Sequence, residues 1–247
     1  MLLLVGVLGL VFGSFAAAAS WRLPRGESLL SRSACPHCHH VLGPRELVPL
    51  LSWLWQKGRC RACGKAISLR YPLLELLTAA LFLGCWLSLR DAPLPLGLAA
   101  AVGTLLLIIL VADLETFIIP DAALLVLTPL ALVWRWLQGN ELVSPLLSGL
   151  VVLGLGLALQ WGYRRVRGFD GLGLGDVKFM GVAALFLGPW GMPGFLLAAG
   201  ILGIVFGLLW RMLGRGAVFP FGPALVVALA LGLIWPDWLE TLRALGL

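Results

Sequence analysis

The fold is decided by one stretch of sequence, Leu105-Leu-Leu-Ile-Ile-Leu-Val-Ala112-Asp113-Leu-Glu-Thr-Phe-Ile-Ile-Pro120-Asp121. It starts with eight apolar residues, as expected of a helix in lipid, and a carboxyl group follows at once. Charged groups at membrane depth are costly and usually mark a functional site. Proline suits the first turn of a helix and pushes its predecessor out of helical geometry. The stretch therefore predicts two membrane helices, the second beginning near Pro120, joined by an acidic turn.

The composition extends this prediction to the whole chain. Its 247 residues are 60% hydrophobic and 12% charged, with a mean hydropathy of +0.99, whereas soluble domains carry about 25% charged residues. We therefore expect an all-α polytopic membrane protein with about eight transmembrane helices. The candidate spans are about 2–19, 72–89, 95–112, 121–137, 142–162, 177–189, 193–212 and 217–235. The sixth is too short to cross the bilayer untilted.

Basic residues predict the orientation of these spans. Segment 20–70 holds nine of the 18 lysines and arginines, and alternation of eight spans divides the basic residues 15 to 3 between the two sides. The positive-inside rule then places segment 20–70, Asp113 and Asp176 at the cytoplasmic face of a multi-pass protein. The basic residues are spread over several loops rather than one stripe, so the net charge of +6 does not indicate nucleic-acid binding.

The polarity of the chain predicts four regions. Residues 1–19 form a first membrane anchor, retained because no positive residue precedes the apolar run. Residues 20–71 form a polar cytoplasmic insert, within a larger N-terminal region of about 8–90. Residues 95–215 form the membrane core, and residues 216–247 form the last span and a C-terminal tail.

The insert contains four of the five cysteines in two Cys-x-x-Cys pairs, Cys35 with Cys38 and Cys60 with Cys63, with 21 residues between the pairs. Two such knuckles bring four thiolates onto one tetrahedral zinc, although the separation is slightly longer than usual. Disulfides are disfavoured in the cytosol, so we expect a four-cysteine zinc site that stabilises this small insert. Three nearby histidines are the competing ligands: His37, His39 and His40. Cys85 is interpreted as a packing residue.

A second aspartate closes a glycine-stepped loop, Gly171-Leu-Gly173-Leu-Gly175-Asp176. Alternating glycines allow positive φ and close approach of a bound peptide. The loop lacks the lysine-serine/threonine ending of a phosphate loop. Two carboxyl groups from separate helix ends, Asp113 and Asp176, are the minimum equipment for acid/base activation of water. The simpler alternative is that acidic residues such as Glu115 and Asp121 only solvate an interfacial turn.

Taken together, these motifs resemble the type IV prepilin peptidases, membrane aspartyl proteases of the Gly-x-Gly-Asp group. The resemblance rests on Asp113-x6-Pro120-Asp121, on Gly173-x-Gly175-Asp176-x-Lys178, on the two cysteine pairs, and on Arg70-Tyr-Pro-Leu-Leu-Glu75. The first span adds Gly13-Ser14-Phe15, followed by Arg22-Leu23-Pro24. The similarity covers essentially the whole chain, with one departure: Ala17 stands where the family usually has asparagine.

The resemblance implies cleavage of the leader from prepilins and pseudopilins in the bacterial inner membrane. It also implies N-methylation of the new amine with S-adenosylmethionine. It assigns catalysis to Asp113 and Asp176, and metal binding to the four insert cysteines. The supporting residues are Gly173, Gly175, Lys178, Pro120, Asp121 and Glu75.

Three alternative functions remain open from the sequence. The first is a peptidase without methyltransferase activity, suggested by Ala17. The second is a transporter that uses its intramembrane carboxylates as a proton relay. The third is a zinc-dependent membrane scaffold without catalysis.

Overall fold

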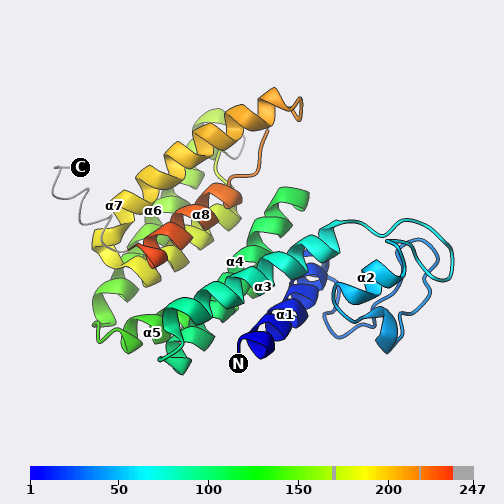
Figure 1. Ribbon diagram of the computed structural model, residues 1–247. Helices are drawn as coiled ribbons and strands as arrows, with labels where there is room; N and C mark the ends of the chain where they lie inside the picture. Colours follow the sequence, from blue (N-terminus) through cyan, green and yellow to red (C-terminus); the bar gives the residue numbers. More distant parts are fainter. Residues whose placement is uncertain (169–170, 217, 236–247) are drawn as a thin grey trace. The chain divides into compact units, whose positions relative to one another are not determined.

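The computed structural model describes residues 1–168, 171–216 and 218–235 (Figure 1). The described residues form helices and loops and contain no strand, only two isolated β-bridges. This confirms the all-α prediction. The chain divides into two compact units, Met1–Ile108 and Ile109–Leu247, and the division falls inside helix α4 (Pro93–Thr116). The predicted tail beyond residue 235 lies outside the described residues.

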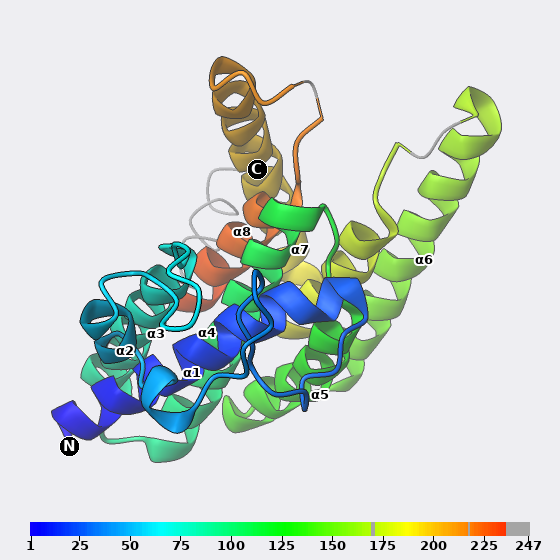
Figure 2. The same cartoon turned by 90° about the vertical axis from the view of Figure 1, so that its right-hand side faces the viewer.

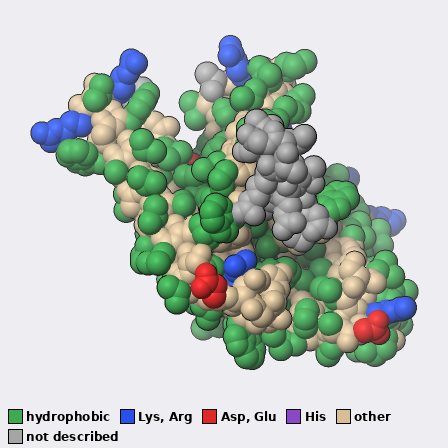
Figure 3. All heavy atoms as spheres, turned by 90° about the vertical axis from the view of Figure 1, so that its left-hand side faces the viewer, with side chains coloured by type: hydrophobic (Ala, Val, Ile, Leu, Met, Phe, Trp, Pro, Cys, Tyr) green, Lys and Arg blue, Asp and Glu red, His purple; other side chains and the backbone are tan. Residues whose placement is uncertain are grey.

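Five described helices are long and apolar enough to cross a membrane. They are α1 (Leu2–Arg22), α3 (Arg70–Leu89), α4, α6 (Val143–Arg167) and α7 (Leu174–Met212). Many of their large apolar side chains are exposed, and Figure 3 shows one face covered mainly by hydrophobic side chains. Exposed apolar surface on this scale marks a membrane or protein contact, so the structure is that of a membrane protein.

The predicted number of eight spans is not confirmed. Helix α5 (Asp121–Leu137) has 17 residues with Pro129 inside it, and α8 (Gly222–Ile234) has 13. The predicted sixth and seventh spans correspond to the two helical parts of α7, which meet at Gly188, where the backbone is non-helical with φ 69° and ψ 179°. The segment before Gly188, residues 174–187, is about 21 Å long at 1.5 Å per residue, which is shorter than a bilayer core.

The interruption at Gly188 reverses the direction of α7. Near the start of the helix, a Cβ on Gly175 would lie 3.0 Å from Ile119. Near its end, the ring of Trp210 lies 6.2 Å from that of Phe117. Both ends of α7 therefore lie near residues 117–119, which requires the chain to fold back on itself, as the ribbon shows (Figure 2). Helix α7 also packs against α5, α6 and α8.

In the first unit, α1 and α3 pack closely through two glycines of α1. A Cβ on Gly9 would lie 2.6 Å from the Cα of Ala79, and a Cβ on Gly13 would lie 2.5 Å from the Cα of Glu75. Glycines four residues apart lie on one helix face, and in lipid such small residues let two backbones approach closely. The pair therefore fixes the register of α1 against α3.

Two side chains of α3 hold the insert and α1 in place. The guanidinium of Arg70 donates to the carbonyl oxygen of Ala17 at 2.7 Å and to the hydroxyl of Ser20 at 2.7 Å. The carboxylate of Glu75 accepts a hydrogen bond from the backbone N–H of Leu50 at 2.8 Å. The insert itself has three short helices: η1 (Leu23–Arg25), η2 (Pro44–Glu46) and α2 (Leu51–Trp55).

A glycine-to-alanine pair tests the α1–α3 contact. We expect Gly9→Ala to lower the free energy of unfolding by about 1–3 kcal/mol, because its methyl group meets backbone that cannot move aside. The control is Gly84→Ala in α3, where a Cβ meets nothing within 4 Å. Thermal unfolding in detergent measures both variants. Equal stability of the two would contradict the close contact.

Candidate active site and metal cluster

Asp113 is buried near the C-terminal end of α4, with 4% of its surface exposed. Its Oδ2 accepts a hydrogen bond from the backbone N–H of Gly222, the first residue of α8, at 2.8 Å. A Cβ on Gly222 would lie only 2.6 Å from the same oxygen. The start of α8 can therefore reach Asp113 only because residue 222 has no side chain.

Asp176 lies in the first turn of α7, which begins directly after Gly173. A Cβ on Gly173 would lie 2.7 Å from Asp176 Oδ2, so the carboxylate folds back over the start of its own helix. The positive pole of a helix favours an acidic group at this position. Gln160 of α6 fixes the preceding loop, because its amide donates to the carbonyl oxygen of Leu172 at 3.1 Å.

The structure brings the two predicted aspartates into one neighbourhood of the second unit. Asp113 and Asp176 are close enough for a direct electrostatic interaction between their carboxyl groups. Ile119, in the turn after α4, also touches the start of α7 beside Gly175. Two carboxyl groups that repel each other electrostatically do not ionise together readily, so one can act as an acid while the other acts as a base.

A second contact joins the same two segments. The ammonium of Lys178 donates to both oxygens of Asp121 at 2.8 Å. Pro120 is the N-cap of α5, and Asp121 is the first residue of that helix, as the sequence predicted. Asp121 thus has a specific partner as well as a favourable place at a helix start. The ion pair ties the turn after Asp113 to the helix that carries Asp176.

The structure corrects the prediction of positive φ for the loop glycines. None of Gly171, Gly173 and Gly175 has positive φ, and Gly173 has φ −63°. Instead, each glycine leaves space for atoms of the protein itself. A Cβ at Gly171 would lie 2.5 Å from the ring of Tyr163, while those at Gly173 and Gly175 would meet Asp176 and Ile119. The alternation of glycines in the sequence could not show whether these positions need positive φ or space for neighbouring side chains.

The four insert cysteines form one cluster in the first unit. Their sulfur atoms all lie within 4.8 Å of one another. Cys35 Sγ is 3.9 Å from Cys63 Sγ, and Cys38 Sγ is 3.9 Å from Cys60 Sγ. A tetrahedral ion with metal–sulfur bonds of about 2.3 Å needs sulfurs about 3.8 Å apart. The cluster therefore has the dimensions of a metal site.

Each cysteine pair is folded by the same local hydrogen bonds. Cys35 N–H donates to His40 and Cys60 N–H donates to Lys65, at 2.9 and 2.8 Å, and a β-bridge flanks each turn. Backbone N–H groups of His37 and Cys38 lower the pKa of the Cys35 thiol from 9.0 to about 6, whereas burial and the neighbouring thiols raise the pKa of Cys38 to about 11. Cys35 is thus the sulfur that most readily becomes a thiolate, which is the metal-binding form.

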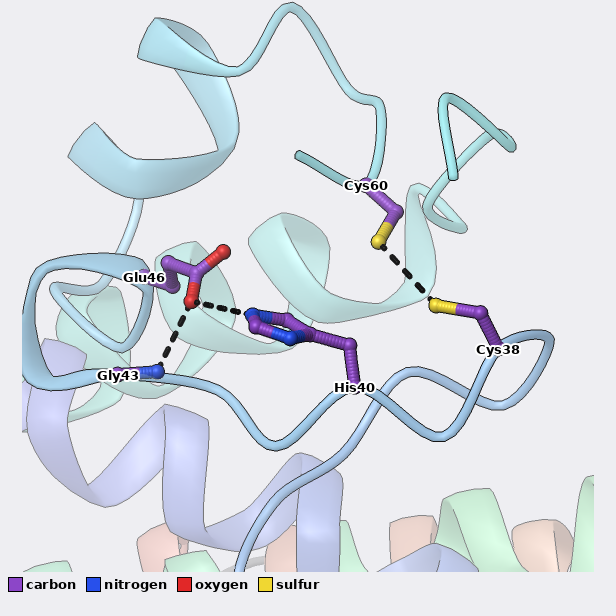
Figure 4. Close-up of polar contacts among 5 residues, drawn as sticks. All are labelled: Cys38, His40, Gly43, Glu46 and Cys60. Carbon is purple, nitrogen blue, oxygen red and sulfur yellow. Dashed lines mark hydrogen bonds and ion pairs between the residues drawn. The ribbon is translucent and has the colours of Figure 1, made fainter. Parts of the chain in front are cut away.

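The histidines are not part of this cluster among the described residues. The His40 ring turns instead toward Glu46, with Nε2 3.4 Å from Oε2 (Figure 4). The same carboxylate oxygen accepts a hydrogen bond from the backbone N–H of Gly43 at 2.9 Å, which lowers the pKa of Glu46. Cys85 lies in α3, away from the other cysteines in the sequence and outside the cluster.

Glu75 belongs to the first unit, where it anchors Leu50 of the insert. Sequence reasoning missed Gly222 and Glu46. The run Phe219-Pro-Phe-Gly-Pro223 marks a turn before a helix and could have indicated Gly222. Nothing in the sequence around Glu46 distinguishes it from other exposed acidic residues.

The fold and the two sites define a class: a helical membrane protein with a pair of carboxyl groups at helix ends and a separate four-cysteine module. The model of the type IV leader peptidase family matches residues 100–208, and that of the bacterial peptidase A24 N-terminal domain matches residues 7–89. With relatives more than 30% identical over nearly the whole chain, the chain belongs to the type IV leader peptidase family.

Several curated relatives are named prepilin leader peptidase/N-methyltransferase. The protein of Aeromonas salmonicida strain A449 is 37% identical over 224 residues, which cover 86% of this chain and 74% of the relative. That of Bacillus subtilis strain 168 is 34% identical over 244 residues, covering 96% and 95%. That of Pectobacterium carotovorum is 30% identical, covering 93% and 91%. No solved structure matches the chain.

A double-mutant cycle tests the Lys178–Asp121 ion pair. Both side chains are more than one third exposed, at 37% and 65%, so solvent screens the pair and we expect a coupling energy of only about 0.2–1 kcal/mol. Lys178→Met, Asp121→Asn and the double variant are compared by unfolding in detergent. A control pair, Arg90→Met with Asp91→Asn, has 63% and 96% exposure and a longer contact of 3.8 Å, and it should show less coupling. Equal coupling in the two cycles would contradict a specific contact.

Proposed function

We propose that this protein is a membrane aspartyl endopeptidase that removes the leader of type IV prepilins and pseudopilins, with Asp113 and Asp176 as its catalytic pair. The observation that carries the proposal is the convergence of these two carboxyl groups from α4 and α7. Family membership supports an enzyme over the proton-relay transporter and the inert scaffold.

The carboxyl pair would cleave the peptide by general acid/base catalysis. The ionised carboxylate removes a proton from water, and the resulting hydroxide attacks the carbonyl carbon of the scissile peptide. The protonated carboxyl group gives its proton to the leaving nitrogen, and the carbon–nitrogen bond breaks. The products are a leader ending in a carboxylate and a pilin with a free amine. Two carboxyl groups that interact electrostatically do not ionise together readily, which would supply the required mixed state.

Lys178 and Gly222 have positioning roles in this proposal. The Lys178–Asp121 pair fixes the distance between the turn after α4 and the start of α7. Gly222 holds one oxygen of Asp113 through its N–H, which leaves the other oxygen of that carboxyl group for water or substrate. Neither residue needs to touch the scissile bond.

The location of the pair suits a substrate with a basic leader and an apolar helix. Asp113 and Asp176 lie at ends of long apolar helices, where the polar leader and water meet the edge of the bilayer. The basic residues at the end of α6, Arg164, Arg165 and Arg167, support a cytoplasmic position for this edge by the positive-inside rule. The enzyme would then work at the cytoplasmic face of the bacterial inner membrane.

The first unit would carry a structural zinc and the methylating function. The cysteine sulfurs have the spacing of a tetrahedral site, and four thiolates at such spacing are typical of structural zinc. Residues 20–71 form the metal-binding insert of an N-terminal region of about 8–90, and residues 95–215 form the peptidase core. S-adenosylmethionine would supply the methyl group for the amine that cleavage exposes.

The catalytic assignment predicts the effect of two amide substitutions. We expect Asp113→Asn and Asp176→Asn each to abolish leader cleavage, because an amide can neither remove a proton from water nor donate one as a carboxylic acid. The loss should be at least about a thousandfold if the pair acts as a unit. Asp91→Asn, at a side chain that is 96% exposed, is the control and should cleave normally. Cleavage of a co-expressed prepilin, read by mass spectrometry, is the measurement. Substantial cleavage by either variant would refute the assignment.

The metal assignment predicts one zinc per chain. Elemental analysis should find it in the unaltered protein and find it lost or sharply reduced in Cys63→Ser, because three thiolates bind less tightly than four. Cys85→Ser is the matched control, since this cysteine is outside the cluster. Thermal unfolding should show a less stable insert in Cys63→Ser only. Metal-free protein of unchanged stability would contradict the proposal.

A further inference from the structure

The short helix α2 of the insert turns an apolar face outward. Leu51, Leu54 and Trp55 lie three and four residues apart, so they share one side of the helix. These side chains are 48%, 61% and 72% exposed. Trp53 packs inside the insert instead, where a Cβ on Gly58 would lie 2.8 Å from its ring. The helix therefore fills the interior of the insert with one aromatic side chain and leaves a second apolar face uncovered.

The chain before α2 extends this apolar surface. Leu47 and Val48 are 43% and 36% exposed and belong to the same stretch, residues 47–55. We call Leu47, Val48, Leu51, Leu54 and Trp55 the insert patch. Single exposed apolar side chains are ordinary, but several together mark a surface that contacts lipid or another protein. The position of the patch decides between these two partners.

A hydrogen bond holds the patch at the edge of the membrane. Helix α3 is long and apolar enough to span the bilayer and starts at Arg70. Its Glu75, in the second turn, accepts a hydrogen bond from the backbone N–H of Leu50 at 2.8 Å. Because helical side chains lean toward the N-terminus, Leu50 lies level with the first turns of α3. Figure 1 shows the insert, with α2, at this end of α3. Residues on both sides of Leu50 therefore meet the head-group layer of the bilayer.

Two arginines lie beside the patch. Trp55 lines a cavity of about 390 Å³ together with Arg45 and Arg59, which are both exposed. Neither arginine forms an ion pair with another described residue. The carboxylate in the same lining, that of Glu46, is held by the N–H of Gly43. Guanidinium groups bind phosphate through paired hydrogen bonds, and basic residues at a membrane edge are attracted to anionic lipids. The charge beside the patch therefore fits a phospholipid head group.

We propose that the insert patch is a membrane-surface anchor and that the two arginines bind the phosphate of an anionic phospholipid. Leu51, Leu54 and Trp55 enter the boundary between head groups and acyl chains, as the apolar face of an interfacial helix does. Trp55 suits this depth because its ring is apolar and its N–H can hydrogen-bond to head groups. The insert is then held against the bilayer at two places, through Glu75 and through the patch. This inference goes beyond the proposed function, because the anchor needs neither cleavage nor methyl transfer.

The anchor also accounts for a strained backbone at Leu50. Its φ of 58° and ψ of −51°, with a hydrogen bond of 2.6 Å from Leu51 N–H to the carbonyl oxygen of Pro49, form the rare type of γ-turn. A leucine with positive φ in such a turn persists only where its surroundings hold it. The bond from its N–H to Glu75 is one such constraint. Contact of the flanking patch with lipid is the second.

Photo-crosslinking of the whole chain in nanodiscs tests the contact with lipid. The photoreactive amino acid p-benzoylphenylalanine replaces Leu54 and, as the control, Lys65, which is exposed in the insert but outside the patch. The discs contain equal amounts of phosphatidylcholine and phosphatidylglycerol. We expect illumination to attach phospholipid at position 54 and to leave position 65 without lipid. Mass spectrometry of the modified peptide identifies the attached lipid by its mass.

The same adducts measure the role of the arginines. One basic residue near an anionic surface corresponds to about a fivefold preference for charged lipid. We therefore expect phosphatidylglycerol adducts at position 54 to exceed phosphatidylcholine adducts by at least about fivefold. Arg45→Gln and Arg59→Gln should each lower this ratio by about fivefold. Arg32→Gln, at an exposed insert position outside the cavity, is the matched control and should leave the ratio unchanged.

Three kinds of result would overturn the inference. A lack of adducts at position 54, or equal lipid attachment at positions 54 and 65, would mean that the patch has no specific contact with the bilayer. An adduct with protein, either a second copy of this chain or another partner, would make the patch a protein interface. Equal adducts of the two lipids, or a ratio that both arginine variants leave unchanged, would show that the arginines do not bind head groups. Leader cleavage enters none of these measurements, so the proposed function is tested separately.

Discussion

The structure depends on one constraint, which is that lipid offers no hydrogen bonds to the backbone. Every N–H and C=O at membrane depth must be paired inside the protein, so the spanning segments are helices. Unpaired backbone groups and charged side chains are then confined to helix ends. Asp113 lies at the end of α4, Asp176 at the start of α7, and the N–H that binds Asp113 comes from the start of α8. The carboxyl groups lie at the ends of helices because a charged group deeper in the membrane would have neither water nor free backbone groups beside it.

The same constraint explains several of the glycines. Lipid supplies little hydrophobic driving force between helices, so close backbone contact becomes the main attraction. Gly9 and Gly13 bring α1 against α3, and Gly222 brings the start of α8 against a carboxylate. Around the start of α7, glycines make room for Tyr163 and Ile119 in the same way. Space, rather than an unusual φ, is what these positions require. Gly188 differs, because it has a positive φ at the reversal of α7.

Much of this architecture could be predicted from the sequence because it is set locally. Apolar runs and Pro120 predicted the start of α5 correctly, and the spacing of the cysteines predicted their cluster. The two aspartates were predicted to meet because each lay at the end of an apolar helix, and the structure brings them together. Other features arise only from tertiary contacts. The pairing of Glu46 with His40 and that of Gly222 with Asp113 leave no periodicity in the sequence.

The two proposed sites differ in what stabilises them, and the chemistry of the substrate sets the order of their reactions. The carboxyl pair gains its power from partial burial at helix ends, whereas the insert has little core and depends on its metal. A peptide nitrogen shares its lone pair with the carbonyl group, which is why the amide is planar. It is therefore a poor acceptor of a methyl group. Cleavage converts it into an amine with a free lone pair. A methylation of the new amine must therefore follow cleavage, and the dependence runs in one direction: the carboxyl pair can cleave without any methyl transfer, but methyl transfer has no acceptor until the carboxyl pair has acted.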